Sequence, residues 1–72
     1  MLGATVAMSV QVAARLRAEV EAGDYPPGSR LPSARQLAER HCVHQSTARR
    51  ALAQLRAEGV AVVRRGVGHL VT

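Results

Sequence analysis

The segment CVHQSTARRALAQL, residues 42–55, decides how the rest of this chain can fold. On a 3.6-residue repeat its small and apolar residues fall on one side of a helix, as expected for a face that packs against a core. These residues are Ala48, Ala51, Leu52 and Leu55. The polar residues of its N-terminal end fall on the flank and back of the same helix: Gln45, Ser46, Arg49 and Arg50. A helix that enters the major groove of DNA presents side chains to base edges from this end.

The composition bounds the class of protein. A chain of 72 residues makes one small domain, which buries only about 60–65% of its unfolded surface and has no room for a deep substrate cavity. The formal net charge is +5, and all 10 basic residues are arginines. Arginine is always charged and matches phosphate or guanine bidentately, so this excess favours a polyanionic partner. A genome bias toward Ala, Val and Arg would give the same composition, which alone does not separate the two explanations.

The single cysteine and the N-terminal segment bear on location. One cysteine, Cys42, excludes an internal disulfide and is consistent with a reducing cytoplasm, which is the location we expect. No apolar run approaches the roughly 20 residues of a membrane span, so no membrane association is expected. Residues 1–8 are apolar but lack a basic leader. We expect them to be an unstructured N-terminal extension.

The first predicted helix follows this extension. Ser9 is a plausible N-cap, Val12, Leu16 and Val20 share one face, and Gly23 suits the position just after a helix.

Two arginine–glutamate pairs at i,i+4 spacing are expected away from the apolar face, Arg15 with Glu19 and Arg17 with Glu21. Together with Arg56 these arginines are predicted to be solvated surface, and Arg30 and Arg40 are weak candidates for a site.

The remaining elements complete the architecture. Prolines and a glycine in residues 24–29 predict a turn, and residues 30–32 are predicted to be extended. Ser33 and Gln36 form the pattern of a capping box that begins a helix over residues 34–41. After a short break at residues 42–44, the helix over residues 45–58 ends at Gly59. Strands over residues 60–65 and 69–72, joined by a tight turn at residues 66–68, predict a hairpin. The fold class is therefore mainly α with a small β-hairpin, a winged helix-turn-helix over residues 9–72.

Several blocks of this sequence resemble a known family. They are GDYPPG (23–28), LPSARQLA (31–38), TARRAL (47–52) and EGV (58–60), followed by the glycines of GVG (66–68). In this order they closely resemble the GntR family of bacterial transcription regulators, over roughly residues 12–72. The resemblance implies an N-terminal winged helix-turn-helix domain that binds double-stranded DNA and, in most members, represses transcription.

The resemblance also implies which residues contact DNA. Arg35 matches an arginine that opens the second helix and touches DNA, and Ser46, Thr47 and Arg49 match recognition-helix positions. Gly66 and the residues beside it match the tip of the wing. The full set of candidate DNA-binding residues is Arg35, His44, Gln45, Ser46, Thr47, Arg49, Arg50, Arg65, Gly66 and Gly68. Helix N-termini and hydroxyls suit phosphate, arginine suits guanine, and a glycine turn lets the backbone approach DNA.

The sequence departs from the family pattern at several positions. The family usually has Glu at Ala34, Gly at Cys42, Ser or Thr at His44, Arg at Gln45 and Val at Ala48. Glutamine in place of arginine at Gln45 exchanges a guanine contact for one that suits adenine. His44 stands where a capping hydroxyl is expected, and an adjacent phosphate would favour its charged form. We therefore predict that DNA binding tightens as the imidazole protonates, and that His44→Asn removes this trend.

Family regulators normally continue into a C-terminal domain that binds a small effector and dimerises, and no such domain is expected within this chain. A homodimer on a two-fold operator is a possible assembly.

We expect no cofactor, no metal and no enzymatic activity. His41, Cys42 and His44 flank one turn without the fourth ligand of a zinc site, and neither Ser33 nor Ser46 has an Asp/His arrangement to activate it. The alternative function is a winged-helix module that binds a protein partner without sequence-specific DNA binding.

Overall fold

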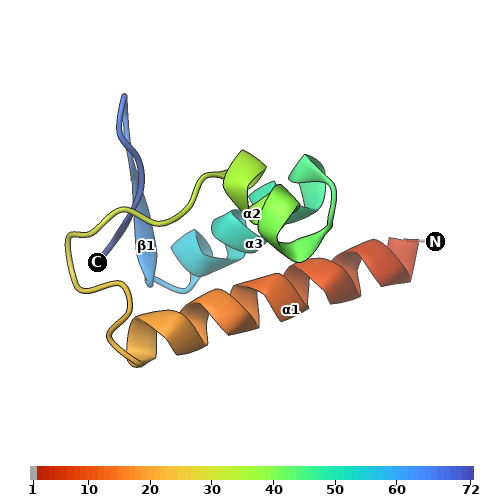
Figure 1. The fold of residues 1–72 in the computed structure, drawn as a ribbon, viewed down its shortest axis with the longest axis horizontal. Helices are drawn as coiled ribbons and strands as arrows, with labels where there is room; N and C mark the ends of the chain where they lie inside the picture. The colour runs from red at the N-terminus through yellow and green to blue at the C-terminus, as the bar shows by residue number, and fades with distance from the viewer. Residues whose placement is uncertain (1) are drawn as a thin grey trace.

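The computed structural model describes the backbone of residues 2–72 and the side chains from residue 7 onward. Its elements are α1 (Leu2–Glu21), α2 (Ala34–His41), α3 (Gln45–Ala57), β1 (Ala61–Arg64) and β2 (Gly68–Val71). The two strands form an antiparallel hairpin. Figure 1 shows α2 and α3 above the long α1, with the hairpin standing at the far end from the N-terminus. The predicted class, mainly α with a small β-hairpin, is confirmed.

Helix α1 begins earlier than the sequence indicated. It starts at Leu2 rather than after Ser9, so residues 2–8, expected to be unstructured, continue the helix. Ser9 is not a cap but lies inside the helix, where it is buried. The segment contains no proline, and once a helix has nucleated each further residue adds one hydrogen bond. The predicted end is confirmed: Gly23 has φ +89°, and the amide of Asp24 donates to the carbonyl of Glu19 at 3.0 Å.

The helix-turn-helix has the predicted boundaries except that α3 ends at Ala57, one residue earlier than predicted. In the capping box of α2 the amide of Gln36 donates to Ser33 Oγ at 3.2 Å, and the amide of Ser33 donates to Gln36 Oε1 at 2.9 Å. The helix ends at Cys42, which has the left-handed φ of 56° and is exposed. The amide of Val43 closes the turn on the carbonyl of Ala38 at 3.0 Å, and α3 starts two residues later.

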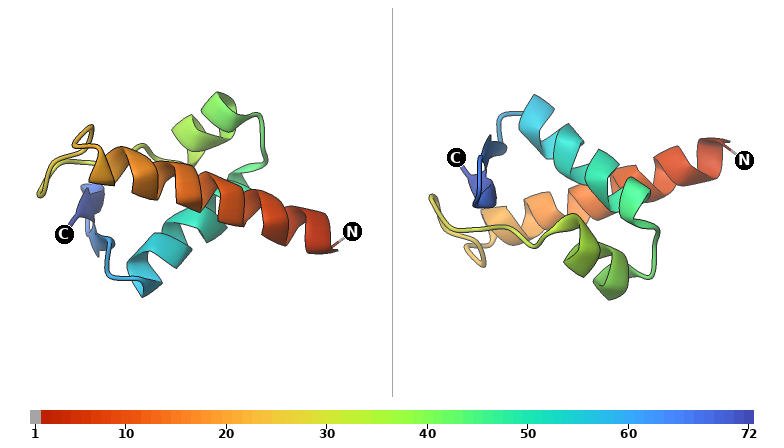
Figure 2. Two further views of the ribbon diagram at one scale, coloured as in Figure 1. Left: turned by 90° about the horizontal axis from the view of Figure 1, so that it is seen from below. Right: turned by 90° about the horizontal axis from the view of Figure 1, so that it is seen from above.

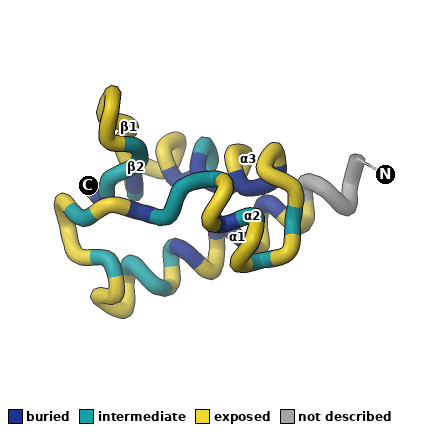
Figure 3. The backbone as a smooth tube through the Cα atoms, turned by 45° about the horizontal axis from the view of Figure 1, so that its top comes forward, coloured by how far each residue is buried: buried dark blue, intermediate teal, exposed yellow. Residues whose placement is uncertain are grey.

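The core lies between α1 and the inner face of α3. The predicted stripe of α3 is confirmed, because its four small and apolar residues are at most 2% exposed. They pack with buried residues from the rest of the chain, namely Val12, Ala13, Leu16, Leu31, Leu37, Ala61 and Val71. Figure 2 shows α1 beneath both α2 and α3, and in Figure 3 the buried segments of these helices face one another. One face of α3 is therefore fixed, which leaves its opposite face toward solvent.

The hairpin is shorter than predicted and has a third member. Ala61 pairs with Val71 and Arg64 with Gly68, and the turn lies at residues 65–67. The segment before α2 adds to the free edge of β2. The amide of Leu31 donates to the carbonyl of His69, and the amide of Val71 donates to the carbonyl of Ser29, both at 2.9 Å. This pairing forms a bridge between Arg30 and Leu70 and fixes the connector against the wing.

Candidate nucleic-acid interface

The outward face of α3 carries most of the predicted recognition residues. Gln45, Ser46, Arg49 and Arg50 are all exposed. Arg49 Nη2 donates to Gln45 Oε1 at 3.3 Å, so the two side chains lie together one turn apart. No acidic residue occurs in the first turn of α3. The N-terminal half of α3 thus presents a guanidinium, an amide and a hydroxyl on the side opposite the core.

Thr47 does not belong to this outward face. It is 4% exposed, because it lies four residues before Ala51 and the 3.6-residue repeat places both on the inner side of α3. The prediction of Thr47 as a side chain that contacts DNA is therefore corrected. Only its backbone amide, which lies in the first turn of the helix, belongs to the amides of the helix N-terminus.

His44 stands at the N-cap of α3. Its backbone is extended, its side chain is exposed, and it makes no capping hydrogen bond. The first amides of a helix have no partner within the helix, and here the N-cap side chain does not supply one. The carbonyl of His44 accepts from the amide of Ala48 at 3.1 Å, which starts the helical hydrogen-bond pattern. An anion at this end would meet free amides and the positive end of the helix dipole.

Arg35 extends from the first turn of α2. Its guanidinium is 3.5 Å from the carboxylate of Glu39, and the two side chains are 80% and 71% exposed. An ion pair this exposed stabilises the protein by at most about 1 kcal/mol. A phosphate could therefore replace the Glu39 carboxylate as the partner of the guanidinium at little cost. Arg35 is therefore available to a ligand in front of α2.

The wing presents basic residues at its tip. Arg64 and Arg65 are exposed, and Gly66 in the turn is exposed with φ +79°. The amide of Val67 donates to the carbonyl of Arg64 at 3.1 Å, which closes the turn. Gly68, which we predicted in the turn, is instead the first residue of β2 and half-buried. A Cβ at Gly68 would lie 3.6 Å from Arg30 Nε, which is an ordinary contact distance, so the guanidinium of Arg30 packs beside this glycine at the base of the wing.

Sequence reasoning gave little weight to three residues that the structure brings to this face. Arg30, Arg56 and His69 line a hollow of about 360 Å³ between α3 and the wing, and Arg49 lines it as well. Arg56 follows Arg49 by seven residues, and this spacing alone could have placed both on one stripe of α3. Arg30 arrives through the unforeseen pairing of its segment with β2.

Two arginines on the other side of the molecule are held in ion pairs. Arg17 forms a two-pronged bond with Glu58, at 2.8 Å and 2.7 Å. This bond lowers the pKa of the Glu58 carboxyl below its ordinary value, and a hydrogen bond from Gln54 adds to the effect. Arg40 lies 3.6 Å from Glu19 and donates to the hydroxyl of Tyr25 at 3.0 Å. The predicted pairs of Arg15 with Glu19 and Arg17 with Glu21 are replaced by contacts between helices.

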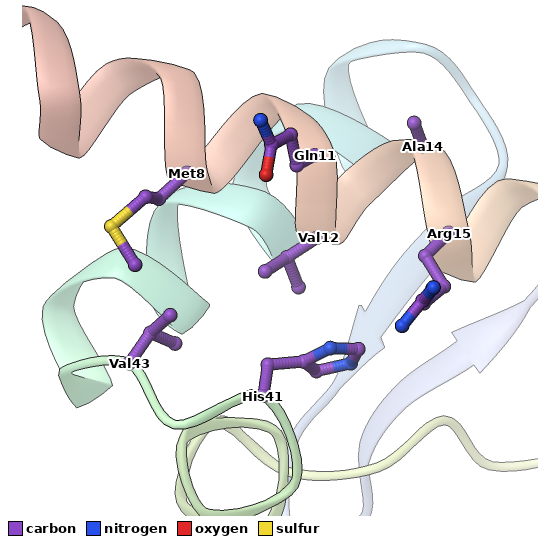
Figure 4. A pocket seen from close by; sticks show the side chains of 7 residues that line it. All are labelled: Met8, Gln11, Val12, Ala14, Arg15, His41 and Val43. Carbon is purple, nitrogen blue, oxygen red and sulfur yellow. The ribbon is translucent and has the colours of Figure 1, made fainter.

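A second hollow, of about 580 Å³, lies between α1 and the end of α2, away from the wing. Figure 4 shows the His41 ring and the Arg15 side chain approaching each other across it, beside apolar residues such as Met8 and Val43. Among the described residues no group of three His, Cys, Asp or Glu could hold a metal ion. No helix in the described part of the chain is long and apolar enough to span a bilayer. The face made by α2, the outer side of α3 and the wing carries the exposed arginines Arg35, Arg49, Arg56, Arg64 and Arg65, and we call it the basic face.

Comparison with known proteins gives consistent results. The model of bacterial regulatory proteins of the gntR family matches residues 8–71. An uncharacterized HTH-type transcriptional regulator of Mycobacterium tuberculosis is 47% identical over 49 residues, which are 68% of this chain and 20% of that protein. A second HTH-type transcriptional regulator of that organism is 37% identical over 67 residues, 93% of this chain and 25% of that protein. The chain thus spans a fifth to a quarter of the length of these relatives.

Solved structures share the fold. Streptococcus agalactiae GntR superposes with a TM-score of 0.77 at 34% identity, over 89% of this chain and 31% of that one. The DNA-binding domain of AraR in complex with an operator superposes with a TM-score of 0.85 over 90% of this chain and 78% of that one. The latter is 23% identical, so its likeness concerns the fold alone.

Proposed function

Because the chain belongs to the GntR family of bacterial regulatory proteins, we propose that it is the sequence-specific double-stranded DNA-binding module of a transcription regulator. The observation that carries the proposal is the outward face of α3, where Gln45, Ser46 and Arg49 are exposed opposite a buried stripe. In this arrangement α3 enters the major groove, and the wing follows the backbone or the minor groove. The AraR domain of the same fold is bound to an operator, which supports duplex DNA as the ligand of this fold here.

The residues divide between base contacts and phosphate contacts. Arg49 suits the O6 and N7 acceptors of guanine, and Gln45 suits the N6 and N7 groups of adenine. The bond between Arg49 and Gln45 is long at 3.3 Å, so each side chain can turn to a base at small cost. Ser46, Arg35 and the free amides at His44 suit phosphates and would set the register. Arg50, Arg65 and Gly66 would contact the backbone from the outer edges.

We propose that the regulator acts by occluding promoter DNA as a repressor. A single domain of this size binds weakly, because about four to six phosphate contacts are screened at physiological salt. Two copies on a two-fold operator would supply the affinity, since the second half-site is then bound at a high effective concentration. The relatives are four to five times longer than the matched segment, and dimerisation and effector binding are proposed for their remaining parts.

Selection from a random duplex library tests the proposal. We expect one sequence to be enriched, and fluorescence anisotropy with that duplex to give a slope of log affinity against log salt of about −4 to −5. A shuffled duplex should bind with a similar slope and much lower affinity. Failure to enrich any sequence, together with equal affinity for the selected and shuffled duplexes, would contradict sequence-specific binding.

The role of Gln45 has its own test. Gln45→Arg restores the side chain usual in the family, and selection with this variant should change one position of the recovered site from adenine to guanine. The parent and the variant are compared in the same library. If both recover the same site, Gln45 does not contact a base.

The alternative is a winged-helix module that binds a protein through its wing. Val62, Val63 and Val67 are 48%, 52% and 39% exposed, and β-branched side chains on an outer strand suit pairing with another chain. Such a module has no need of Arg35 or Arg49. Loss of duplex binding in Arg35→Ala and Arg49→Ala supports the DNA-binding function. A Val63→Thr variant that binds DNA normally would show that the exposed valine of the wing is not needed for DNA binding.

A further inference from the structure

We propose that Arg30, Arg56 and His69 form a phosphodiester site at the base of the wing, which binds the DNA strand that runs between α3 and the wing. The inference rests on the proposed function and adds a contact that the recognition helix and the wing tip do not supply. It concerns backbone affinity and its dependence on pH, and it assigns no role in sequence recognition to these three residues.

Three separate elements bring these side chains together. Arg30 comes from the segment paired with β2, and its guanidinium lies over Gly68, where an added Cβ would be 3.6 Å from Nε. Arg56 comes from the last turn of α3, and its Nη1 lies 3.5 Å from Nε2 of His69. His69 is in β2, next to Gly68. All three line the same hollow of about 360 Å³.

The charges around the hollow have one sign. Its lining contains Arg30, Arg49, Arg56 and His69 and no acidic side chain. Among the described residues the ion pairs involve other arginines, Arg17, Arg35 and Arg40. The remaining lining residues, from α2, α3 and the segment before α2, are uncharged, and the strand partner of His69 is Val63. The carboxylate of Glu39 lines an adjoining hollow together with Arg30 and Arg35.

The position of the hollow determines which anion it meets. The sugar–phosphate backbone separates the major groove from the minor groove, so a strand must cross between a helix in one groove and a wing in the other. The hollow lies at this crossing, between α3 and β2. Two guanidinium groups and an imidazole can satisfy the oxygens of one phosphate without reading a base.

His69 makes the site sensitive to pH. Partial burial, followed by the charge of Arg56, holds the pKa of His69 below its ordinary value, so the imidazole of the free protein favours its neutral form. A bound phosphate would favour the imidazolium instead, and DNA binding would then take up a proton. By linkage, affinity should rise as the pH falls from the pKa of the bound state toward that of the free state.

The test uses a duplex recovered by selection and copies of it that carry one neutral methylphosphonate at successive backbone positions. We expect Arg30→Ala and Arg56→Ala each to lower affinity about three- to tenfold for selected and shuffled duplexes alike, and to reduce the salt slope by about 1. Arg56→Lys should recover part of the loss. One methylphosphonate position should weaken the wild type but not Arg56→Ala, because the contact is already missing. Arg15→Ala on α1 is the matched control and should bind as the wild type.

The pH arm separates His69 from His44. Affinity of the wild type should rise toward acid pH. The sequence alone predicted that His44→Asn removes this rise; with His69 in the site, the part that depends on His69 should remain in His44→Asn and be lost in His69→Gln. Inorganic phosphate alone should leave the imidazole signals of His69 unchanged at concentrations where the duplex saturates them. Saturation by phosphate alone, with displacement of the duplex, would overturn the proposal in favour of a site for a free anion.

Failure of this inference differs from failure of the proposed function. If Arg30→Ala, Arg56→Ala and His69→Gln all bind as the wild type while Arg49→Ala is weak, the phosphodiester site is wrong and the recognition helix stands. If Arg49→Ala also binds normally and no duplex is selected, the proposed function fails as well.

Discussion

The arginines of this protein have two different fates. On the side of α1, Arg17 and Arg40 are held by Glu58 and by Glu19 with Tyr25. On the side of α3 and the wing, the side chains of Arg49 and Arg56 form hydrogen bonds with the polar side chains of Gln45 and His69. The same residue type therefore joins helices on one side and is available to a ligand on the other.

This difference follows from where the carboxylates lie. Each of the five acidic residues belongs to α1, to the turn after it, to α2 or to the end of α3, and none belongs to the wing. A modest net charge of +5 is thereby concentrated on one face, which raises the local potential for a polyanion far more than the total indicates. Net charge indicates a class of partner, whereas the pairing of individual charges indicates the surface.

The sharpest test of this contrast is Arg49→Ala against Arg15→Ala. Both variants remove one exposed charge, but only the first removes it from the basic face. We expect Arg49→Ala to lower affinity for the selected duplex by about 1–3 kcal/mol, which is roughly fivefold to 150-fold. Arg15→Ala should change it less than twofold. Equal losses in anisotropy titrations would mean that total charge, and not its arrangement, drives binding.

The turn that joins α2 to α3 sets the angle between these two helices, and its backbone is strained. Cys42 has φ 56°, a conformation that costs a residue with a side chain about 1–2 kcal/mol but suits glycine. Cys42→Gly should therefore raise stability by about 0.5–1 kcal/mol after its larger unfolded-state entropy is counted. Thermal melts should show a Tm higher by about 3–6 °C.

Cys42→Ser serves as the control, because it removes the thiol and keeps the strain, and its Tm should match that of the parent. DNA affinity should be similar in all three proteins. A higher Tm in Cys42→Ser as well would show that the thiol and not the backbone is responsible.

The smallest effect is expected for the paired arginine. Arg17→Ala should lower the Tm slightly at neutral pH and leave DNA affinity unchanged. Since the folded-state pKa of Glu58 is lowered, its stabilising contribution is present above the unfolded-state pKa and is lost as the pH falls through the folded-state pKa. The melting curves of the variant and wild type should therefore converge in acid. A gap that persists there would assign the effect to lost packing of the Arg17 side chain.

The sequence predicted the helix-turn-helix and the outward face of α3 because both depend on local signals. The capping box at Ser33, the glycine after α3 and the apolar stripe through Leu52 and Leu55 each act within one or two helical turns. The exposure of Arg49 follows from that stripe, since a helix with one fixed face has only one free face.

The remaining features depend on contacts between distant segments. Arg30 joins the basic face only because residues 28–31 pair with β2, and no periodicity within the connector indicates this. Arg17 pairs with Glu58 instead of Glu21, the partner predicted at i,i+4, because the end of α3 packs beside α1. Thr47 was an error of another kind. We predicted a DNA contact from its position in the family pattern, although the helical repeat places it on the inner face of α3. In the structure its side chain is buried, as the repeat indicates.

The central claim is that the face made by α2, the outer side of α3 and the wing binds duplex DNA. Amide chemical-shift mapping of the 72-residue chain during titration with the selected duplex tests it most directly. The account predicts the largest shifts at Arg35, at residues 44–50 and at residues 64–69, with α1 nearly unaffected. Largest shifts along α1 around Met8 and Arg15, with Arg49 unchanged, would contradict it.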